Sequence, residues 1–238
     1  MAAGIRTTIM IMPERPVGSS SPQSLVRLMT WLSPAFPVGG FAYSGGLEAA
    51  VCEGHVSGAG DLAAWVATLL DAGSLRNDAI LLAEAHRAFD DAGRLAEVAA
   101  LAAALAGSAE RYHEAVNQGD AFLAAASAWP QPVLSLLGGG TAYSVAVGAV
   151  AAGNGVTLGD TLIAFLQAQC GQLVSAAIRL SVIGQRQAVA IMAGLEGQLI
   201  AQAQAIEGSG LEDLGSATVV ADMLSMRHET QYSRLFQS

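Results

Sequence analysis

The residues best suited to chemistry fall into short motifs, and two of these motifs are visibly incomplete. Cys52 and His55 have C-x-x-H spacing, and nickel or zinc accepts such ligands, but two ligands do not make a site. The acidic pair Asp90-Asp91 is followed by Arg94, where the D-D-x-x-D motif of helical isoprenoid synthases needs a third Asp. The sequence therefore predicts no metal ligands and no catalytic residues in these motifs.

A loop of unusual composition spans residues 33–48, with the sequence S-P-A-F-P-V-G-G-F-A-Y-S-G-G-L-E. Two prolines stiffen it, and its glycine pairs allow positive φ or close backbone approach. The glycine spacing is similar to that of a phosphate-binding loop, but Gly46 stands where Lys is required. Phe41 and Tyr43 are interpreted instead as aromatic contacts for a protein partner. The open alternative is that Phe36 and Phe41 anchor the loop to the core.

A row of polar side chains interrupts an otherwise apolar helix predicted over residues 158–183. The row consists of Gln169, Gln172, Ser175 and Arg179, and Gln185 follows just beyond. Such a row must be solvated, paired internally or matched to a partner. A plain solvated face and a paired seam at an interface both remain open.

The sequence ends in S-M-R-H-E-T-Q-Y-S-R-L-F-Q-S, residues 225–238. Chain ends usually fray, but this one is dense in arginine, aromatic and hydrogen-bonding groups. Such residue types anchor interfaces, so we expect a recognition tail over residues 227–238 that orders on a partner. The tail residues expected to make contacts are Arg227, His228, Tyr232 and Arg234.

Composition excludes several classes of function. All eleven basic residues of the 238 are arginine, and without lysine neither a Walker A loop nor Schiff-base chemistry is possible. The net charge of −9 argues against a nucleic-acid partner. The two cysteines, far apart in the sequence, fit a reducing cytoplasm better than a disulfide framework. No cofactor is expected.

The elements that must position these motifs are predicted to be helices throughout. Alanine is abundant and alternation with period two is almost absent, which favours an all-α fold. We expect a single-domain orthogonal helical bundle of about nine or ten helices over residues 22–226, preceded by a flexible segment, residues 1–21, and followed by the tail as part of the same domain. The predicted helices start near residues 22, 46, 61, 78, 94, 108, 141, 158, 187 and 217.

One apolar segment raises the alternative of a membrane-associated helical protein. Residues 133–152 pass a crude transmembrane window, but three consecutive glycines lie within the segment and basic anchors do not flank it. A buried core helix over 141–152 is therefore preferred. Ser144, Gly148 and Ala152 recur every four residues, a spacing that lets a neighbouring helix approach closely.

Three segments resemble the urease accessory protein UreF family: residues 33–48, A-I-R-L-S-V-I-G-Q at 177–185, and S-M-R-H-E-T-Q-Y-S-R-L-F at 225–236. The resemblance implies an all-helical, non-enzymatic maturation chaperone that forms a homodimer. It further implies binding to a UreD/UreH-like accessory protein and recruitment or regulation of the nickel-carrying GTPase UreG, for nickel insertion into apo-urease in the cytoplasm. By position it implies the partner-binding residues Phe41, Tyr43, Glu48, Arg179, Gln185, Arg227, His228, Tyr232 and Arg234.

Two other classes remain alternatives at this stage. One is a helical-bundle enzyme of unknown chemistry, for which no convergent acid, base or metal set is apparent in the sequence. The other is the membrane-associated helical protein.

Overall fold

The computed structural model describes residues 20–238, and over this range the chain is helical without a strand. The helices are α1 (Pro22–Trp31), α2 (Leu47–Cys52), α3 (Ala59–Ala72), α4 (Ser74–Arg87), α5 (Ala92–Ala104), α6 (Ala109–Ala126), α7 (Tyr143–Gly153), α8 (Leu158–Arg179), α9 (Gln185–Ile206) and α10 (Val219–His228). Short 3₁₀ turns are η1 (Gly40–Ala42), η2 (Pro132–Ser135) and η3 (Leu211–Asp213). The predicted all-α bundle is confirmed.

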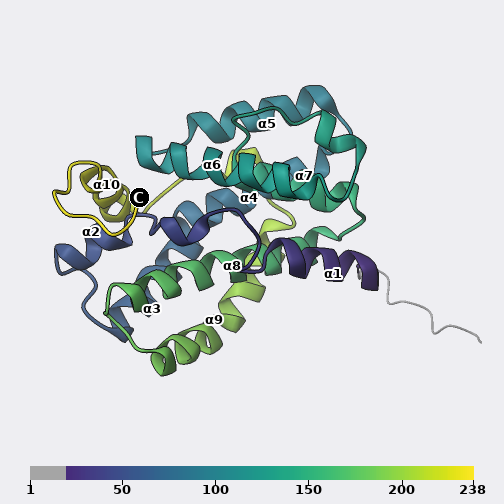
Figure 1. Cartoon of the computed structure of the whole chain (residues 1–238). Helices are drawn as coiled ribbons and strands as arrows, with labels where there is room; N and C mark the ends of the chain where they lie inside the picture. The colour runs from purple at the N-terminus through teal and green to yellow at the C-terminus, as the bar shows by residue number, and fades with distance from the viewer. Residues whose placement is uncertain (1–19) are drawn as a thin grey trace, which may run out of the picture.

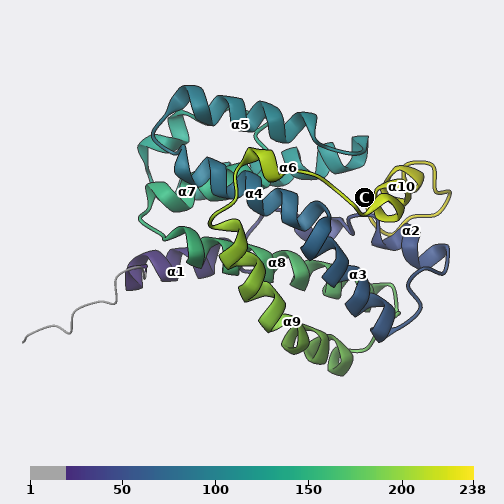
Figure 2. The same ribbon diagram turned by 180° about the vertical axis from the view of Figure 1, so that it is seen from behind.

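Helix α4 lies in the middle of the bundle (Figures 1 and 2). It packs on α7 along one side and on α3, α8 and α9 along the other, while α5 packs on α4 and α6 packs on α7. The two ends of the described chain lie far apart: α1 projects at one end of the molecule, and α10 lies beside α2 at the other (Figure 1).

Two predicted helix starts are capped as their sequences suggested. The Ser21 side chain accepts a hydrogen bond from the Ser24 amide at the start of α1, and Thr157 accepts one from the Asp160 amide at the start of α8. Of the predicted flexible segment 1–21, residues 1–19 lie outside the described range. Ser20 is held in place, because its amide donates to the Asp160 carboxylate at 3.0 Å.

Helix α8 ends at Arg179, four residues before the predicted end at residue 183. The chain turns there through Ser181, which has a φ of 61°. The amides of Ser181 and Val182 donate to the carbonyls of Ile178 and Ala177, the pair of bonds that defines a Schellman motif. A serine in the left-handed position therefore does what glycine usually does, and nothing in the local sequence announces this stop.

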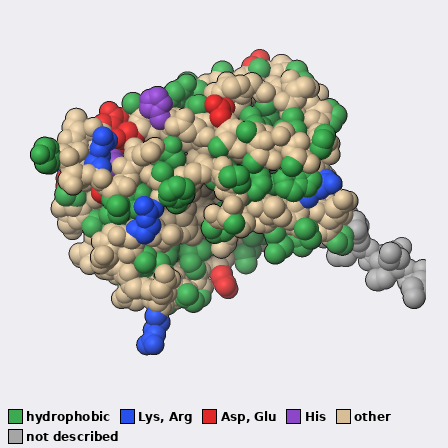
Figure 3. All heavy atoms as spheres, in the orientation of Figure 1, with side chains coloured by type: hydrophobic (Ala, Val, Ile, Leu, Met, Phe, Trp, Pro, Cys, Tyr) green, Lys and Arg blue, Asp and Glu red, His purple; other side chains and the backbone are tan. Residues whose placement is uncertain are grey.

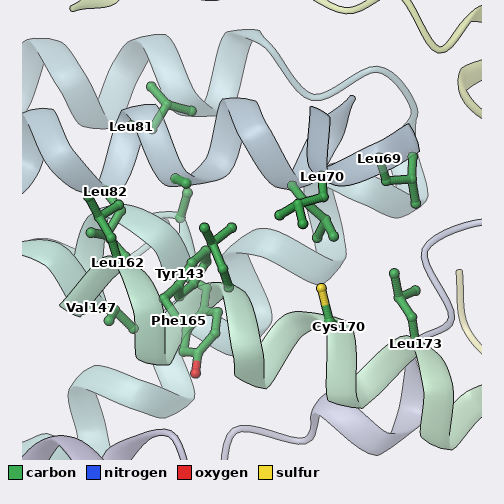
Figure 4. Packing of buried hydrophobic residues seen from close by; sticks show 14 of the residues in the cluster. Leu69, Leu70, Leu81, Leu82, Tyr143, Val147, Leu162, Phe165, Cys170 and Leu173 are labelled. Carbon is green, nitrogen blue, oxygen red and sulfur yellow. The ribbon is translucent and has the colours of Figure 1, made fainter. Parts of the chain in front are cut away.

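The core gathers apolar side chains from α3, α4, α7 and α8 into one cluster (Figure 4). Residues 143–151 of α7 are buried on every side, so the preferred reading of this segment as a core helix is confirmed. Helix α8 is the described helix that is long and apolar enough to cross a membrane, with a mean hydropathy of 1.4 over a window that is half buried. Its buried face packs against α4 and α9.

Glycine permits the closest helix contacts of the bundle. A Cβ atom added at Gly148 of α7 would overlap the carbonyl oxygen of Leu82 in α4, and one added at Gly119 of α6 would overlap the carbonyl oxygen of Thr141. The close approach predicted from the small residues of α7 is confirmed. These close contacts fix the backbones of α4, α6 and α7 relative to one another. Larger side chains fill the space that remains.

Gly148→Ala is expected to lower the free energy of unfolding by about 1–3 kcal/mol, because α4 and α7 must separate to admit the methyl group. Gly194→Ala is the matched control, since Gly194 is an exposed residue inside α9 and an added Cβ would have no atom within 4 Å. We expect the control to be up to about 1 kcal/mol more stable than the parent. Urea denaturation measures both, and equal stability of the two variants would contradict the tight α4–α7 contact.

Candidate functional site

The three segments singled out from the sequence meet at the α2–α10 end of the molecule (Figure 1). After α10 the chain loops outward and returns, so that the end of the tail lies against residues 42–48. The Gln237 amide donates to the Ala42 carbonyl at 2.8 Å, and the Ser44 amide donates to the Ser238 carbonyl at 3.0 Å. Loop and tail therefore form one structural unit although almost two hundred residues separate them.

The Glu48 carboxylate, 7% exposed, is the centre of this unit. It accepts hydrogen bonds from the backbone amides of Leu235 at 2.7 Å and Phe236 at 2.8 Å, and from His228 Nε2 at 3.1 Å. The loop places it there because Gly46 begins α2 with a φ of 82° and lies against the Ser225 backbone. A buried carboxylate requires several donors, and here the tail provides all three of these.

His228 lies between two carboxylates and is 0% exposed. Its Nδ1 lies 2.6 Å from Glu110 of α6, opposite the contact of Nε2 with Glu48. The second oxygen of Glu110 receives the Arg234 guanidinium at 2.6 Å. Because both ring nitrogens face carboxylate oxygens, the doubly protonated imidazolium is the form that donates both bonds.

A second acidic cluster holds the last residue of the tail. Ser238 Oγ donates to Glu114 at 2.9 Å, and the same carboxylate receives Arg111 at 2.8 Å. Arg111 also reaches Asp78 of α4 at 3.2 Å. Burial raises the pKa of the Asp78 carboxyl, and the Glu114 carboxylate raises the pKa of the Arg111 guanidinium. Helices α4 and α6 and the tail thus share one ionic cluster.

Arg179 connects α8 to both the loop and the tail. Its guanidinium donates to the Phe41 carbonyl and lies 4.3 Å from the centre of the Phe236 ring, a cation–π distance. Phe236 is buried beneath it, while the Phe41 side chain is 76% exposed on η1. Tyr43 points inward, and its hydroxyl accepts a hydrogen bond from Asn117 at 3.2 Å.

The predicted site residues therefore divide into two groups. Tyr43, Glu48 and His228 are buried and build the site. Phe41 and Tyr232 are exposed, the latter completely. Arg227 pairs with Glu53 on the surface at 2.6 Å, and Arg234 remains partly exposed beside Glu110. Gln185 lies exposed at the first turn of α9, outside the network around Glu48.

The expectation of a tail that orders only on a partner is wrong for this structure. Phe236 is 4% exposed and Ser238 is 1% exposed, both packed against the chain itself. The physical reason lies in Glu48, Glu110 and Glu114, acidic groups that the tail satisfies. Sequence reasoning missed Glu110, Arg111 and Glu114, because ordinary charged residues on an amphipathic helix give no sign that they face a segment more than a hundred residues away.

The polar row of α8 lines a cleft of about 400 Å³ opposite the stiff loop. The row contributes Gln169, Gln172, Ser175 and Arg179, and the loop contributes residues 33–41. Gln169 and Gln172 are half-buried and Ser175 is exposed. The row therefore faces a solvated cleft, and its use as an interface stays a prediction.

The metal-binding pair considered in the sequence lies on the surface. Cys52 and His55 are exposed near the end of α2. In the part of the chain that the structure describes, His, Cys, Asp and Glu form no group of three or more arranged to hold a metal ion. Glu48 and Glu110 do not converge on one point either, because they contact opposite nitrogens of the His228 ring.

At this end of the molecule Arg and acidic side chains lie close together on the surface, and apolar side chains are scattered over the face that Figure 3 shows. Near the tail, the large exposed apolar and aromatic residues are Phe41, Met223, Met226, Tyr232 and Leu235. Residues of this type are enriched in protein–protein interfaces. Together with the buried network, they give a rigid surface with exposed anchors and no assembled catalytic group.

Comparison with known proteins gives consistent matches. The profile of the UreF family matches residues 56–196. The chain is 57% identical over 221 residues to the urease accessory protein UreF of Rhizobium etli. This alignment covers 93% of this chain and 99% of that protein. It is 60% identical over 215 residues to the urease accessory protein UreF of Agrobacterium fabrum, covering 90% and 96%. The corresponding protein of Sinorhizobium medicae is 51% identical over 216 residues, covering 91% and 97%.

Glu48→Ala is expected to release the tail, because His228 and two backbone amides lose their shared acceptor. Removing one partner of a buried ionic network costs about 3–5 kcal/mol, so the amides of Leu235 and Phe236 should exchange with deuterium much faster. Hydrogen exchange with mass spectrometry of the C-terminal peptides measures this.

Glu53→Ala is the control at the other end of α2, since Glu53 pairs with Arg227 at the surface. It should change stability by no more than about 1 kcal/mol. If the tail amides are as well protected from exchange in Glu48→Ala as in Glu53→Ala, then Glu48 does not hold the tail.

Proposed function

The chain belongs to the UreF family of urease accessory proteins, which are accessory proteins and not enzymes, and from this premise we propose that it is a maturation chaperone for urease. In this proposal it binds a UreD/UreH-like accessory protein and recruits or regulates the GTPase UreG, so that nickel is incorporated into apo-urease. The chain's part is recognition and positioning, and its partners carry out bond-making and nickel handling.

The observation that carries the proposal is the surface built by the docked tail. Glu48 and His228 fix the backbone of the tail from inside, while Tyr232 and Leu235 project outward from it. Phe41 joins the same surface, because Arg179 links its carbonyl to the ring of Phe236. Large side chains presented on a rigid backbone bind with a small loss of conformational entropy, which favours high affinity.

Charge gives this surface a preference among partners. Arg227 and Arg234 lie within it, and each uses part of its guanidinium on a carboxylate of the same chain. The remaining N–H groups are available to carboxylates of a partner, for which the planar guanidinium has matching geometry. The surface therefore suits a partner that presents an apolar pocket rimmed by acidic side chains.

We also propose that the protein acts as a homodimer in the cytoplasm. Exposed apolar side chains occur on the outer faces of α8, α9 and α10, among them Ile163, Val189, Ile200 and Val220. Such helical faces most often pack against a second copy of the same chain, because most soluble oligomers are homo-oligomers. Both cysteines are free, as a reducing compartment requires.

Tyr232→Ala tests the recognition surface without disturbing the fold, because this side chain is fully exposed. If Tyr232 is an interface anchor, affinity for the UreD-like protein or for UreG should fall by about 2 kcal/mol or more, which is roughly thirtyfold. Titration calorimetry with each purified partner measures this.

Met29→Ala, which truncates a large exposed side chain on α1 at the opposite end of the molecule (Figure 1), serves as the control and should bind the accessory and GTPase partners as the parent does. Unchanged affinity of Tyr232→Ala for both partners would remove the tail surface from the proposal.

Light scattering tests the homodimer. At micromolar concentration the purified chain should have about twice its monomer mass of 24.2 kDa, since burying exposed helix faces stabilises the pair. A mass near 24.2 kDa over this concentration range would contradict self-association without a partner.

A further inference from the structure

We propose that the tail, residues 227–238, docks with His228 as the imidazolium, protonated on both ring nitrogens, so that loss of one of these protons loosens the tail. The inference goes beyond the proposed function, because docking is intramolecular and requires no partner. It concerns the conditions under which the recognition surface exists at all.

The geometry of the His228 ring carries the argument. The ring is fully buried, with Nδ1 at 2.6 Å from Glu110 and Nε2 at 3.1 Å from Glu48. A neutral imidazole has one N–H and one lone pair. In the neutral form one ring nitrogen would therefore direct its lone pair at a carboxylate oxygen, in a place that water does not reach.

The charges around the ring lead to the same conclusion. Glu48 faces it from α2 and Glu110 from α6, and Arg234 of the tail neutralises the outer oxygen of Glu110. With His228 charged, two cations balance two carboxylates. Without that charge, one negative charge stays buried without compensation, which a low-dielectric interior strongly disfavours.

Other charged groups near this end of α10 cannot replace the proton. Arg227 is paired with Glu53 at the surface, at 2.6 Å. Glu229 accepts a hydrogen bond from the Ala109 amide at 2.8 Å and would add only negative charge. His228 is therefore the group on which compensation of Glu48 depends.

Loss of the proton acts on the tail through Glu48. The same carboxylate holds the amides of Leu235 and Phe236, so electrostatic repulsion between Glu48 and Glu110 disturbs the anchor of the returning chain. Loss of the proton thus weakens docking, so the docking equilibrium falls when rising pH removes it. For one proton the fall is at most about tenfold per pH unit.

The test uses the full chain labelled with ¹⁵N in its histidines. Long-range ¹H–¹⁵N spectra, recorded from mildly acidic to alkaline pH, show whether both His228 ring nitrogens carry protons while the tail is docked. In parallel, deuterium exchange of the Leu235 and Phe236 amides, divided by the rates of an unstructured peptide at each pH, reports docking. We expect two protonated ring nitrogens, and a corrected protection that falls where the spectra show the ring losing one of these protons.

His228→Gln and His113→Gln complete the test. Glutamine at 228 should give a loosely held tail whose corrected protection no longer follows pH, whereas the change at exposed His113 of α6 should leave the parent profile intact. A neutral His228 ring in the docked tail would overturn the proposal, even if His228→Gln failed to fold. Protection independent of pH in the parent chain would overturn it equally.

Discussion

Burial of a single carboxylate organises the α2–α10 end of this protein. Glu48 has almost no access to water, and a carboxylate in that position is stable only with several donors around it. Two come from the backbone of the returning tail and one from His228. The path of the last twelve residues, the orientation of the histidine and the outward direction of the neighbouring side chains all follow from this requirement.

The rest of the bundle provides a rigid frame for that arrangement. Glycines in α6 and α7 bring backbones together at distances that no larger residue allows, so α4, α6 and α7 have little freedom to slide. Helix α6 contributes Glu110 and Glu114 to the tail, and its position is fixed by this packing. The ionic contacts are therefore formed between groups that were already in place, which reduces the loss of entropy on docking.

The helical fold was predictable because its signals are local. Caps at Ser21 and Thr157, and the small residues of α7, act over a few positions and were interpreted correctly. The stop at Ser181 was not foreseen, since serine seldom adopts a left-handed backbone. Among the site residues, Phe41 and Tyr43 stood out through their unusual loop, whereas only the family resemblance pointed to Glu48.

The acidic partners of the tail on α6 did not stand out. A charged residue on a helix face looks solvated until the segment that covers it is known. The docked tail was therefore unpredictable from composition alone, although each of its residues had been noticed.

The contacts of the tail have a consequence for how the molecule is made. They join residues 118 to 188 positions apart, whereas helix pairs such as α3–α4 and α8–α9 are neighbours along the chain. Contacts between distant residues close the largest loops and tend to form late. The docked surface therefore forms only after α2, α6 and α10 have come together, so a molecule that presents this surface is one whose helical bundle is already folded.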